Sequence, residues 1–444
     1  MAPDMKGAED LPWPPARTAW FVAIVLMIAN TLAFVDRQAL ALLVEPIKQD
    51  LAVSDTAMSL LYGLSFTLFY VTVGIPVARL ADRSNRRNII AASVFVWSLA
   101  TAMCGLVRSF GGLFVARVCV GAGEAGFSPS AYSILADYFP RDRLASAMGV
   151  YQMGVYLGGA LALLIGGMVA VVLPPLSTIA LPILGEIKGW HLIFLVLGIP
   201  GILLSLVVLR IREPVRRGVK ADAGHVPLST LFAHVGARKK AYIGIIIGYA
   251  LMILVGNGTG AWIPAFFTRE FGWTTAEIGL RYGLIVFICG TTGALAGGFC
   301  ASWLQRSGYA RGNLAVSLTG FAALIPLTVS FPLVGSATLA LALIGGMNFF
   351  AGFNLGGGLA TLQDLTPNRM RALVSAGYML AVNLIGGALG PMVVALITDY
   401  GFQDPQRLPE AIAITCAVFS PLAVLFLWVG MRGVAQAAAL PAAR

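Results

Sequence analysis

Four ionisable residues stand inside long apolar stretches, where charge is costly. Asp36 and Arg37 are adjacent in one stretch, and Arg117 and Glu124 lie in another. One charge at the centre of a membrane helix costs roughly 2.5–3.5 kcal/mol, so four unpaired charges would cost on the order of 10 kcal/mol. Such groups pair with one another or face a wet cavity, where they bind substrates or relay protons. The chemistry expected here is therefore ion pairing and proton transfer.

The spacing of these residues indicates a common site. Arg117 and Glu124 are seven positions apart, so on a helix they share one face about 10 Å apart. Asp36 and Arg37 diverge by roughly 100° on a helix, so one lines a cavity while the other reaches a neighbouring helix. Two interpretations remain, a structural ion pair that fixes the packing of two helices and a binding site for substrate and protons. We favour the binding site, because intramembrane ionisable groups commonly mark transport paths.

The elements that must carry these residues are membrane-spanning helices. Of 444 residues, 58% are hydrophobic and 11% are charged, whereas soluble domains carry about 25% charged residues. Apolar runs long enough to cross a bilayer as a helix recur along the chain. The runs lack the alternation of barrel strands, so we predict an all-α membrane protein. The predicted spans lie near residues 18–44, 56–80, 88–108, 110–138, 144–172, 190–210, 241–267, 275–304, 313–333, 337–363, 370–398 and 409–431.

The spans fall into two sets of six that resemble each other. Ala125-Gly126-Phe127 recurs 226 residues later as Ala351-Gly352-Phe353, and Gly158-Gly159-Ala160-Leu161 recurs 228 residues later as Gly386-Gly387-Ala388-Leu389. Matches in order at nearly one offset indicate a parallel repeat of two pseudo-symmetric bundles. The predicted domains are an N-terminal segment (1–17), a six-helix bundle (18–210), a basic linker (211–240), a second bundle (241–431) and a tail (432–444).

Loop charges predict the orientation of the chain. The net charge is +10, and the excess of Lys and Arg lies on the side of the two termini and of the linker 211–240. The positive-inside rule therefore places both termini in the cytoplasm of a multi-pass inner-membrane protein. We expect no nucleic-acid binding, because these basic residues cluster in short loops between spans. The segment Leu173–Gly189 contains three prolines and is predicted to form a short hairpin at the other side.

The second bundle offers apolar residues where the first has charges. A shift of 226 positions sets Leu343 against Arg117 and Phe350 against Glu124. A cavity that is charged on one wall and aromatic on the other suits an amphipathic solute, with its head group against the first bundle. The predicted wall of the second bundle comprises Asn257, Trp262, Asn348, Phe349, Phe350, Phe353 and Asn354.

The loop Ala78–Arg87 reads A-R-L-A-D-R-S-N-R-R and resembles the signature G-x-L-a-D-R-x-G-R-R of the major facilitator superfamily. Both glycines of the signature are replaced here, by Ala78 and Asn85. The resemblance implies that Asp82 latches the cytoplasmic ends of the two halves. The same charges would also arise in any positive-inside loop. The matching residues, and hence the predicted cytoplasmic gate, are Asp82, Arg83, Arg86 and Arg87.

A second motif resembles one branch of this superfamily. The stretch Arg117-Val-Cys-Val-Gly-Ala-Gly-Glu124-Ala is similar to the fourth-helix motif R-x-x-x-G-x-G-E-A, and Asp36-Arg37 and Ala136-Asp137-Tyr138-Phe139 complete a likeness to spinster proteins. The resemblance implies movement of lysophospholipids or sphingoid lipids by alternating access, coupled to protons. It also implies that the head-group and coupling site is formed by Asp36, Arg37, Arg117 and Glu124.

Other functions are weighed against this one. A proton-coupled carrier of small organic anions or drugs would use Arg37 and Arg117 to bind a carboxylate. A membrane-embedded lipid enzyme is disfavoured because no Cys/His constellation, metal site or phosphate loop is visible, and a channel because it needs a continuous polar path. No cofactor is expected besides the proton, and the predicted partners are the solute and the surrounding lipids of a monomer.

No histidine lies at mid-membrane depth, so a carboxylate must carry any coupling proton. Asp36 and Glu124 are the candidates, since burial disfavours an ionised carboxylate and a nearby arginine favours it. Solute binding to the arginine would release a carboxylate to take a proton.

Replacing the carboxylate tests this scheme. Glu124→Gln removes a proton acceptor and is expected to abolish the pH dependence of uptake, measured in proteoliposomes at two pH values. Unchanged pH dependence in this variant would contradict proton binding by Glu124.

Overall fold

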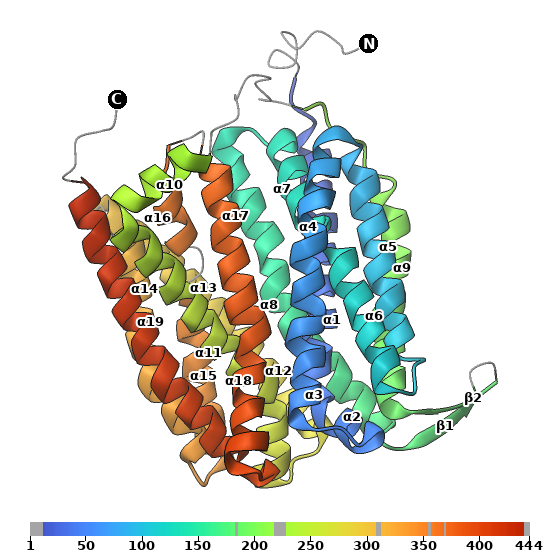
Figure 1. Cartoon of the computed structure of the whole chain (residues 1–444). Coiled ribbons are helices and arrows are strands. Elements are labelled where there is room, and N and C mark those ends of the chain that lie inside the picture. Colours follow the sequence, from blue (N-terminus) through green and yellow to red (C-terminus); the bar gives the residue numbers. More distant parts are fainter. Residues whose placement is uncertain are drawn as a thin grey trace. The chain divides into compact units, whose positions relative to one another are not determined.

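The computed structural model describes residues 12–182, 185–216, 228–307, 312–353, 357–367 and 370–438. In this part of the chain, 12 helices are long and apolar enough to cross a membrane (Figure 1). Most of their ends lie within a few residues of the predicted spans, so the all-α prediction is confirmed. Parts of the predicted N-terminal segment, linker and tail lie outside the described residues, as does Asn354.

The chain forms two compact units that nearly follow the two predicted bundles. The first contains the described parts of Met1–Val53, Ser65–Asp222 and Thr274–Gly283, and the second contains those of Ser54–Leu64, Ala223–Trp273 and Leu284–Arg444. Two short segments thus pack with the other half of the sequence. Both adjoin π-helical turns, η1 (Leu60–Leu64) and η2 (Val286–Gly290), where the backbone departs from regular α geometry.

The first unit is built from helices that pack through small residues. Gly154 and Gly158 of α8 face the backbone of α1 at Met27 and Thr31, where a Cβ would lie 2.7 Å and 2.4 Å from carbonyl oxygens. Because glycine has no side chain, these helices approach closely. The helices of this unit are α1 (Ala16–Leu42), α2 (Val44–Leu51), α4 (Ser65–Arg83), α5 (Arg86–Cys104), α6 (Phe110–Glu124), α7 (Phe127–Tyr138), α8 (Arg141–Val172) and α9 (Gly189–Val208), with most of α12 (Thr275–Ile285).

The second unit begins with α3 (Asp55–Ser59) and η1. Its longest helices, α11 (Lys239–Phe271) and α19 (Leu408–Ala438), lie side by side. Gly244 faces Gly430, where a Cβ on Gly244 would lie 2.4 Å from the backbone nitrogen of Gly430. The other elements are α10 (Leu228–Ala237), η2, α13 (Thr291–Arg306), α14 (Gly312–Ser330), η3 (Phe331–Leu333), α15 (Ala337–Phe353), α16 (Gly357–Leu365), α17 (Arg371–Ala381), η4 (Val382–Ala388), α18 (Leu389–Leu396), η5 (Ile397–Phe402) and η6 (Pro405–Arg407).

The predicted hairpin between the fifth and sixth spans is confirmed. Strands β1 (Thr178–Leu181) and β2 (Gly185–Lys188) pair antiparallel and project beyond the ends of α8 and α9 (Figure 1). Asp50 at the end of α2 forms an ion pair with Lys188 and accepts a hydrogen bond from Trp190 Nε1 at 2.7 Å. Burial alone would raise the pKa of Asp50, but these two donors outweigh it and hold that pKa below its ordinary value.

The packing of α11 on α19 generates a test with an internal control. Gly244→Ala places a methyl group against the backbone of Gly430, and such overpacking costs about 1–3 kcal/mol. We expect a lower melting temperature in detergent. Gly256→Ala on the same helix meets nothing within 4 Å and gains helix propensity, so its melting temperature should stay equal or rise. Equal melting temperatures for the two variants would contradict this packing.

Candidate functional site

The four intramembrane charges come together inside the first unit. α1 carries Asp36 and Arg37, and α6 carries Arg117 and Glu124. Asp36, Arg117 and Glu124 are each 1% exposed, whereas the side chain of Arg37 is 27% exposed. Arg37 is therefore the member of the group that is most accessible to a ligand.

Contacts between α1 and α6 explain how the adjacent residues divide their roles. Arg37 Nε donates to Glu124 Oε2 at 2.9 Å, and Arg37 Nη2 pairs with the same oxygen. Arg117 Nη1 donates to the backbone oxygen of Asp36 at 3.1 Å. The Arg37 side chain thus reaches the neighbouring helix, as one member of the pair was expected to do. The Arg37–Glu124 ion pair lowers the cost of burying both of its members.

Several polar atoms in and beside this group have no hydrogen-bond partner within the described part of the chain. They include Asp36 Oδ1, Glu124 Oε1 and Arg117 Nε, together with Trp97 Nε1 and Thr101 Oγ1 on α5. Each unmet buried group costs about 1–3 kcal/mol. The group therefore retains both acceptors and donors that a proton or a ligand could satisfy.

The residues predicted for the apolar wall are placed differently from one another. Phe349, Phe350 and Phe353 on α15 form a half-buried aromatic cluster, with ring centroids 5.2 Å and 6.0 Å apart. Asn257 is also half-buried, and Asn348 donates its Nδ2 hydrogen to the carbonyl of Ile344 at 2.9 Å, one turn back on α15. The aromatic cluster therefore belongs to one helix of the second unit.

Trp262, which the sequence assigned to the apolar wall, is buried in this structure. Its side chain is 1% exposed, and its Nε1 donates to the carbonyl of Pro391 at 3.0 Å. A buried indole needs an acceptor for its N–H, and the Pro391 carbonyl supplies one inside the unit. Trp262 therefore contributes to the packing of α11 against α18.

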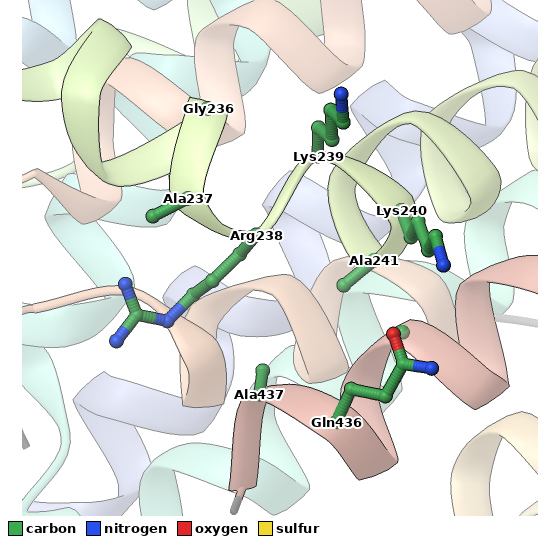
Figure 2. Close-up of a pocket in the computed structure, with 9 residues that line it drawn as sticks. Gly236, Ala237, Arg238, Lys239, Lys240, Ala241, Gln436 and Ala437 are labelled. Carbon is green, nitrogen blue, oxygen red and sulfur yellow. The ribbon is translucent and has the colours of Figure 1, made fainter. Parts of the chain in front are cut away.

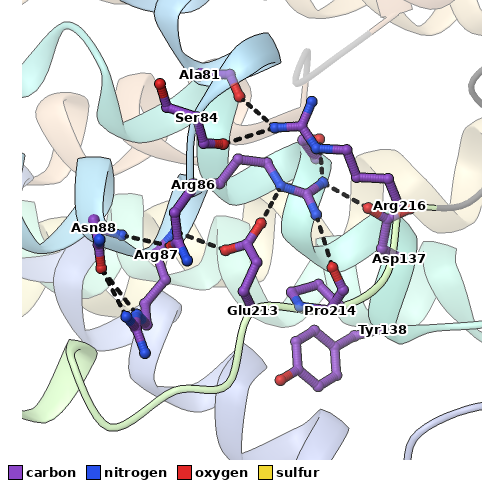
Figure 3. A network of polar contacts seen from close by, with 12 residues as sticks. Ala81, Ser84, Arg86, Arg87, Asn88, Asp137, Tyr138, Glu213, Pro214 and Arg216 are labelled. Atoms are coloured by element: carbon purple, nitrogen blue, oxygen red, sulfur yellow. Dashed lines mark hydrogen bonds and ion pairs between the residues drawn. The ribbon is translucent and has the colours of Figure 1, made fainter. Parts of the chain in front are cut away.

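Two of the predicted gate residues lie in a buried ion-pair network of the first unit (Figure 3). Arg86 Nη1 donates to Asp137 Oδ2 at 2.5 Å, and Arg86 Nε donates to Glu213 Oε1 at 2.8 Å. The backbone N–H of Arg87 donates to Glu213 Oε2 at 2.9 Å. The network ties the start of α5 to the end of α7 and to the segment after α9. Asp82 and Arg83 end α4, and the positions of their side chains are not described.

Sequence reasoning did not anticipate that Asp137 and Glu213 join this network. Glu213 is one of few acidic residues in the basic linker, and Asp137 ends the fourth span next to Tyr138. In the sequence, the only indication of such a role was an isolated acidic residue near many arginines. Which arginine each acid pairs with is decided only when the fold brings the end of α7, the start of α5 and the linker together.

A second buried ion pair, in the second unit, was also not anticipated. Arg269 at the end of α11 donates from Nη1 and Nη2 to the two carboxylate oxygens of Asp55, each at 2.7 Å. Thr56 donates from its backbone nitrogen and its hydroxyl to Asp399 Oδ2, each at 2.7 Å. These contacts fasten α3 to the ends of α11 and η5. In the sequence the same acids are indistinguishable from solvated loop charges.

A cavity of about 270 Å³ lies where α10 meets α11, beside the end of α19. Its lining includes Arg238, Lys239 and Lys240, whose side chains point in different directions (Figure 2). Because these three side chains do not converge, they are not arranged to bind a single anion together. The buried charges of the first unit remain the stronger candidate.

Comparisons with known proteins agree on the type of protein. Residues 26–391 match the family model described as Major Facilitator Superfamily. The chain is 29% identical over 415 residues to an MFS-type efflux pump of Mycolicibacterium smegmatis, covering 93% of this chain and 92% of that protein. It is 25% identical over 449 residues to a probable L-galactonate transporter of Escherichia coli, covering 95% and 94%.

Among solved structures, the chain resembles a bacterial homolog of the human lysosomal transporter Spinster in an inward-facing, unoccupied conformation. The TM-score is 0.73 at 28% identity, with 96% of this chain and 98% of the other covered. The likeness to spinster proteins that the motifs indicated is thus confirmed, and the proteins compared are transporters, not enzymes.

Removing one partner of the Asp55–Arg269 pair tests its structural role. Asp55 is 0% exposed and the Arg269 side chain is 5% exposed, so Asp55→Asn removes the carboxylate of a buried, two-bonded ion pair, at a cost of about 3–5 kcal/mol. We expect a marked fall in melting temperature. Glu410→Gln breaks an exposed pair with Arg407 in the same unit and should cost at most about 1 kcal/mol. An equally small effect of both substitutions would contradict the buried pair.

Proposed function

Because this chain belongs to the major facilitator superfamily, we propose that it moves an amphipathic, lipid-like solute by alternating access, coupled to protons. That it is a multi-pass membrane transporter follows from the family and from the 12 candidate spans. The observation that carries the finer proposal is the Arg37–Glu124 ion pair in the first unit, with Asp36 and Arg117 beside it. The solute class we propose is a lysophospholipid or a sphingoid-type lipid.

The head group of the solute would bind at Arg37. This guanidinium is partly exposed, and its Nε and Nη2 groups both donate to one oxygen of Glu124. An anionic head group would compete with Glu124 for Arg37, because both are acceptors of charge-assisted hydrogen bonds. Once Arg37 binds the solute, the buried carboxylate loses its counter-ion and takes up a proton. Exchange of one ion pair for another would thus couple solute to proton.

Asp36 offers a second proton site beside the first. Its Oδ1 lacks a partner among the described residues, and the nearby Arg117 is engaged with the backbone of α1. Asp36 would therefore respond to changes at α6 without contacting the solute itself. In this proposal Arg117 holds α1 and α6 in register while Arg37 changes its partner.

The hydrocarbon portion of the solute would bind aromatic side chains. The cluster of Phe349, Phe350 and Phe353 supplies such a surface in the second unit. Each buried methylene contributes about 0.8 kcal/mol, so a short length of acyl chain would dominate the affinity. The likeness to a solved bacterial homolog of Spinster agrees with the resemblance from which this class of solute was inferred.

A second candidate function is proton-coupled transport of a small organic anion. The relative named as a probable L-galactonate transporter supports it. A sugar acid would place its carboxylate on Arg37, and its hydroxyls would meet the unpaired polar atoms near Asp36 and Glu124. This function requires a polar surface around Arg37, whereas a lipid-like solute requires an apolar one.

The orientation, the gate and the oligomeric state are proposed on separate grounds. The surplus of basic residues beside the termini supports an orientation with both termini in the cytoplasm of an inner membrane. The loop signature supports a gate at Asp82, Arg83, Arg86 and Arg87, with Arg86 and Arg87 held by Asp137 and Glu213. We propose that the transporter works as a monomer.

Binding of matched ligands distinguishes the two candidates. We expect 1-oleoyl-lysophosphatidylglycerol to bind the purified protein at least about a hundredfold more tightly than glycerophosphoglycerol, since four buried methylenes contribute about 3 kcal/mol. Calorimetry below the micellar concentration measures both, and Arg37→Ala should weaken both. Equal affinities for the two ligands would contradict a lipid-like solute. Saturable binding of L-galactonate without lysolipid binding would favour the organic anion.

A further inference from the structure

Three aromatic rings lie close to the guanidinium of Arg37. The carbon Cζ of Arg37 lies 4.4 Å from the ring centroid of Phe66, 4.9 Å from that of Phe34 and 5.3 Å from that of Tyr70. All three distances are within the roughly 6 Å over which a cation is attracted to an aromatic face. We call Phe34, Phe66 and Tyr70 the aromatic collar. All of it belongs to the first unit.

Helical spacing and close packing build the aromatic collar. Phe66 and Tyr70 are one turn apart on α4, and their rings stack with centroids 5.5 Å apart. Phe34 lies one turn before Arg37 on α1. Gly121 of α6 allows α4 to approach, because a Cβ there would lie 2.4 Å from the carbonyl oxygen of Phe66. A short side chain on α6 is thus a condition for the position of the collar.

Phe66 stands beside two cations. The ring centroid of Phe66 also lies 5.8 Å from Cζ of Arg117. Phe66 is buried, whereas Phe34 and Tyr70 are half-buried. The Phe66 ring therefore lies within cation–π range of both the partly exposed arginine and the buried one. Phe66 is suited to hold the position of Arg37, and Phe34 and Tyr70 are suited to contact a ligand.

The collar restricts how a ligand reaches Arg37. Nε and Nη2 point to Glu124, and the rings lie near the guanidinium. A ligand that binds the remaining edge must also contact Phe34 or Tyr70. A fully hydrated anion would lose water against these rings without new hydrogen bonds, whereas an anion joined to an apolar group would gain contact area.

We propose that Phe34, Phe66 and Tyr70 are specificity-determining residues that select an anionic group attached to an apolar chain. This inference rests on the proposed function and refines it, since it places an apolar subsite next to the charge and within one unit. The sequence interpretation assigned the apolar wall to the second bundle alone. Phe66 is the positioning residue of the set, and it acts through Arg37.

The test compares variants that keep apolar volume but remove the aromatic face. In Phe66→Leu and Phe34→Leu, which remove a ring and no polar group, we expect binding of 1-oleoyl-lysophosphatidylglycerol to weaken about five- to thirtyfold, the range set by a partly desolvated cation–π contact. Phe66→Tyr retains an aromatic face and should lose less affinity than Phe66→Leu. Phe114→Leu is the matched control, because Phe114 pairs with Phe110 one turn away on α6, in the same unit. It should change affinity less than twofold.

A second measurement needs no ligand and separates this inference from the proposed function. Phenylglyoxal modifies accessible arginines, and mass spectrometry gives the rate at Arg37. We expect that rate to rise several-fold in Phe66→Leu and in Phe34→Leu, with no change in Phe114→Leu. If the unmodified protein binds no lysolipid, the proposed function fails, and the labelling rates still decide whether the collar positions Arg37. Unchanged binding and unchanged labelling in both leucine variants would overturn the inference.

Discussion

The ion pair between Arg37 and Glu124 is the interaction on which the proposed function of this transporter depends. An isolated charge at bilayer depth is unstable, so each member requires the other or a substitute. Oε2 of Glu124 accepts hydrogen bonds from Arg37, and Oε1 of Glu124 has no hydrogen-bond partner in the described part of the chain. A pair held in this way is stable enough to fold and open enough to exchange partners. In the proposed scheme, an anion that replaces Glu124 on Arg37 leaves that carboxylate to take up a proton.

Close helix packing places that pair and determines what surrounds it. Glycines on α6 and α8 let α4 and α1 approach until backbones touch, and this brings the aromatic rings of α4 over the guanidinium. The same device joins α11 to α19 in the second unit. In lipid, helices gain little from hydrophobic association, so small residues and a few buried polar contacts decide the arrangement. The positions of the glycines therefore shape the site as much as the positions of the charged residues do.

The aromatic surroundings of Arg37 change how the solute is best pictured. The sequence suggested one charged bundle and one apolar bundle. In the structure, the first unit places apolar aromatic rings next to the charged side chain of Arg37. The buried pairs at the ends of helices, Arg86 with Asp137 and Glu213, and Arg269 with Asp55, serve a different purpose. They fasten segments within each unit. Ion pairs at the helix ends thus hold the fold together, whereas we propose that the central pair exchanges partners.

The sequence by itself determined the class of the protein, the 12 spans, the hairpin near residues 173–189 and the identity of the four central charges. Hydrophobic length and the cost of buried charge are local properties, so they can be read without a fold. Only the tertiary structure decided that Arg37 pairs with Glu124, that Trp262 is internal, and that Phe34, Phe66 and Tyr70 enclose Arg37. It also revealed the roles of Asp55, Asp137 and Glu213, which look like ordinary loop acids. These features depend on the rotation of each helix and on approaches of a few ångströms between helices, and the one-dimensional pattern of apolar residues carries neither.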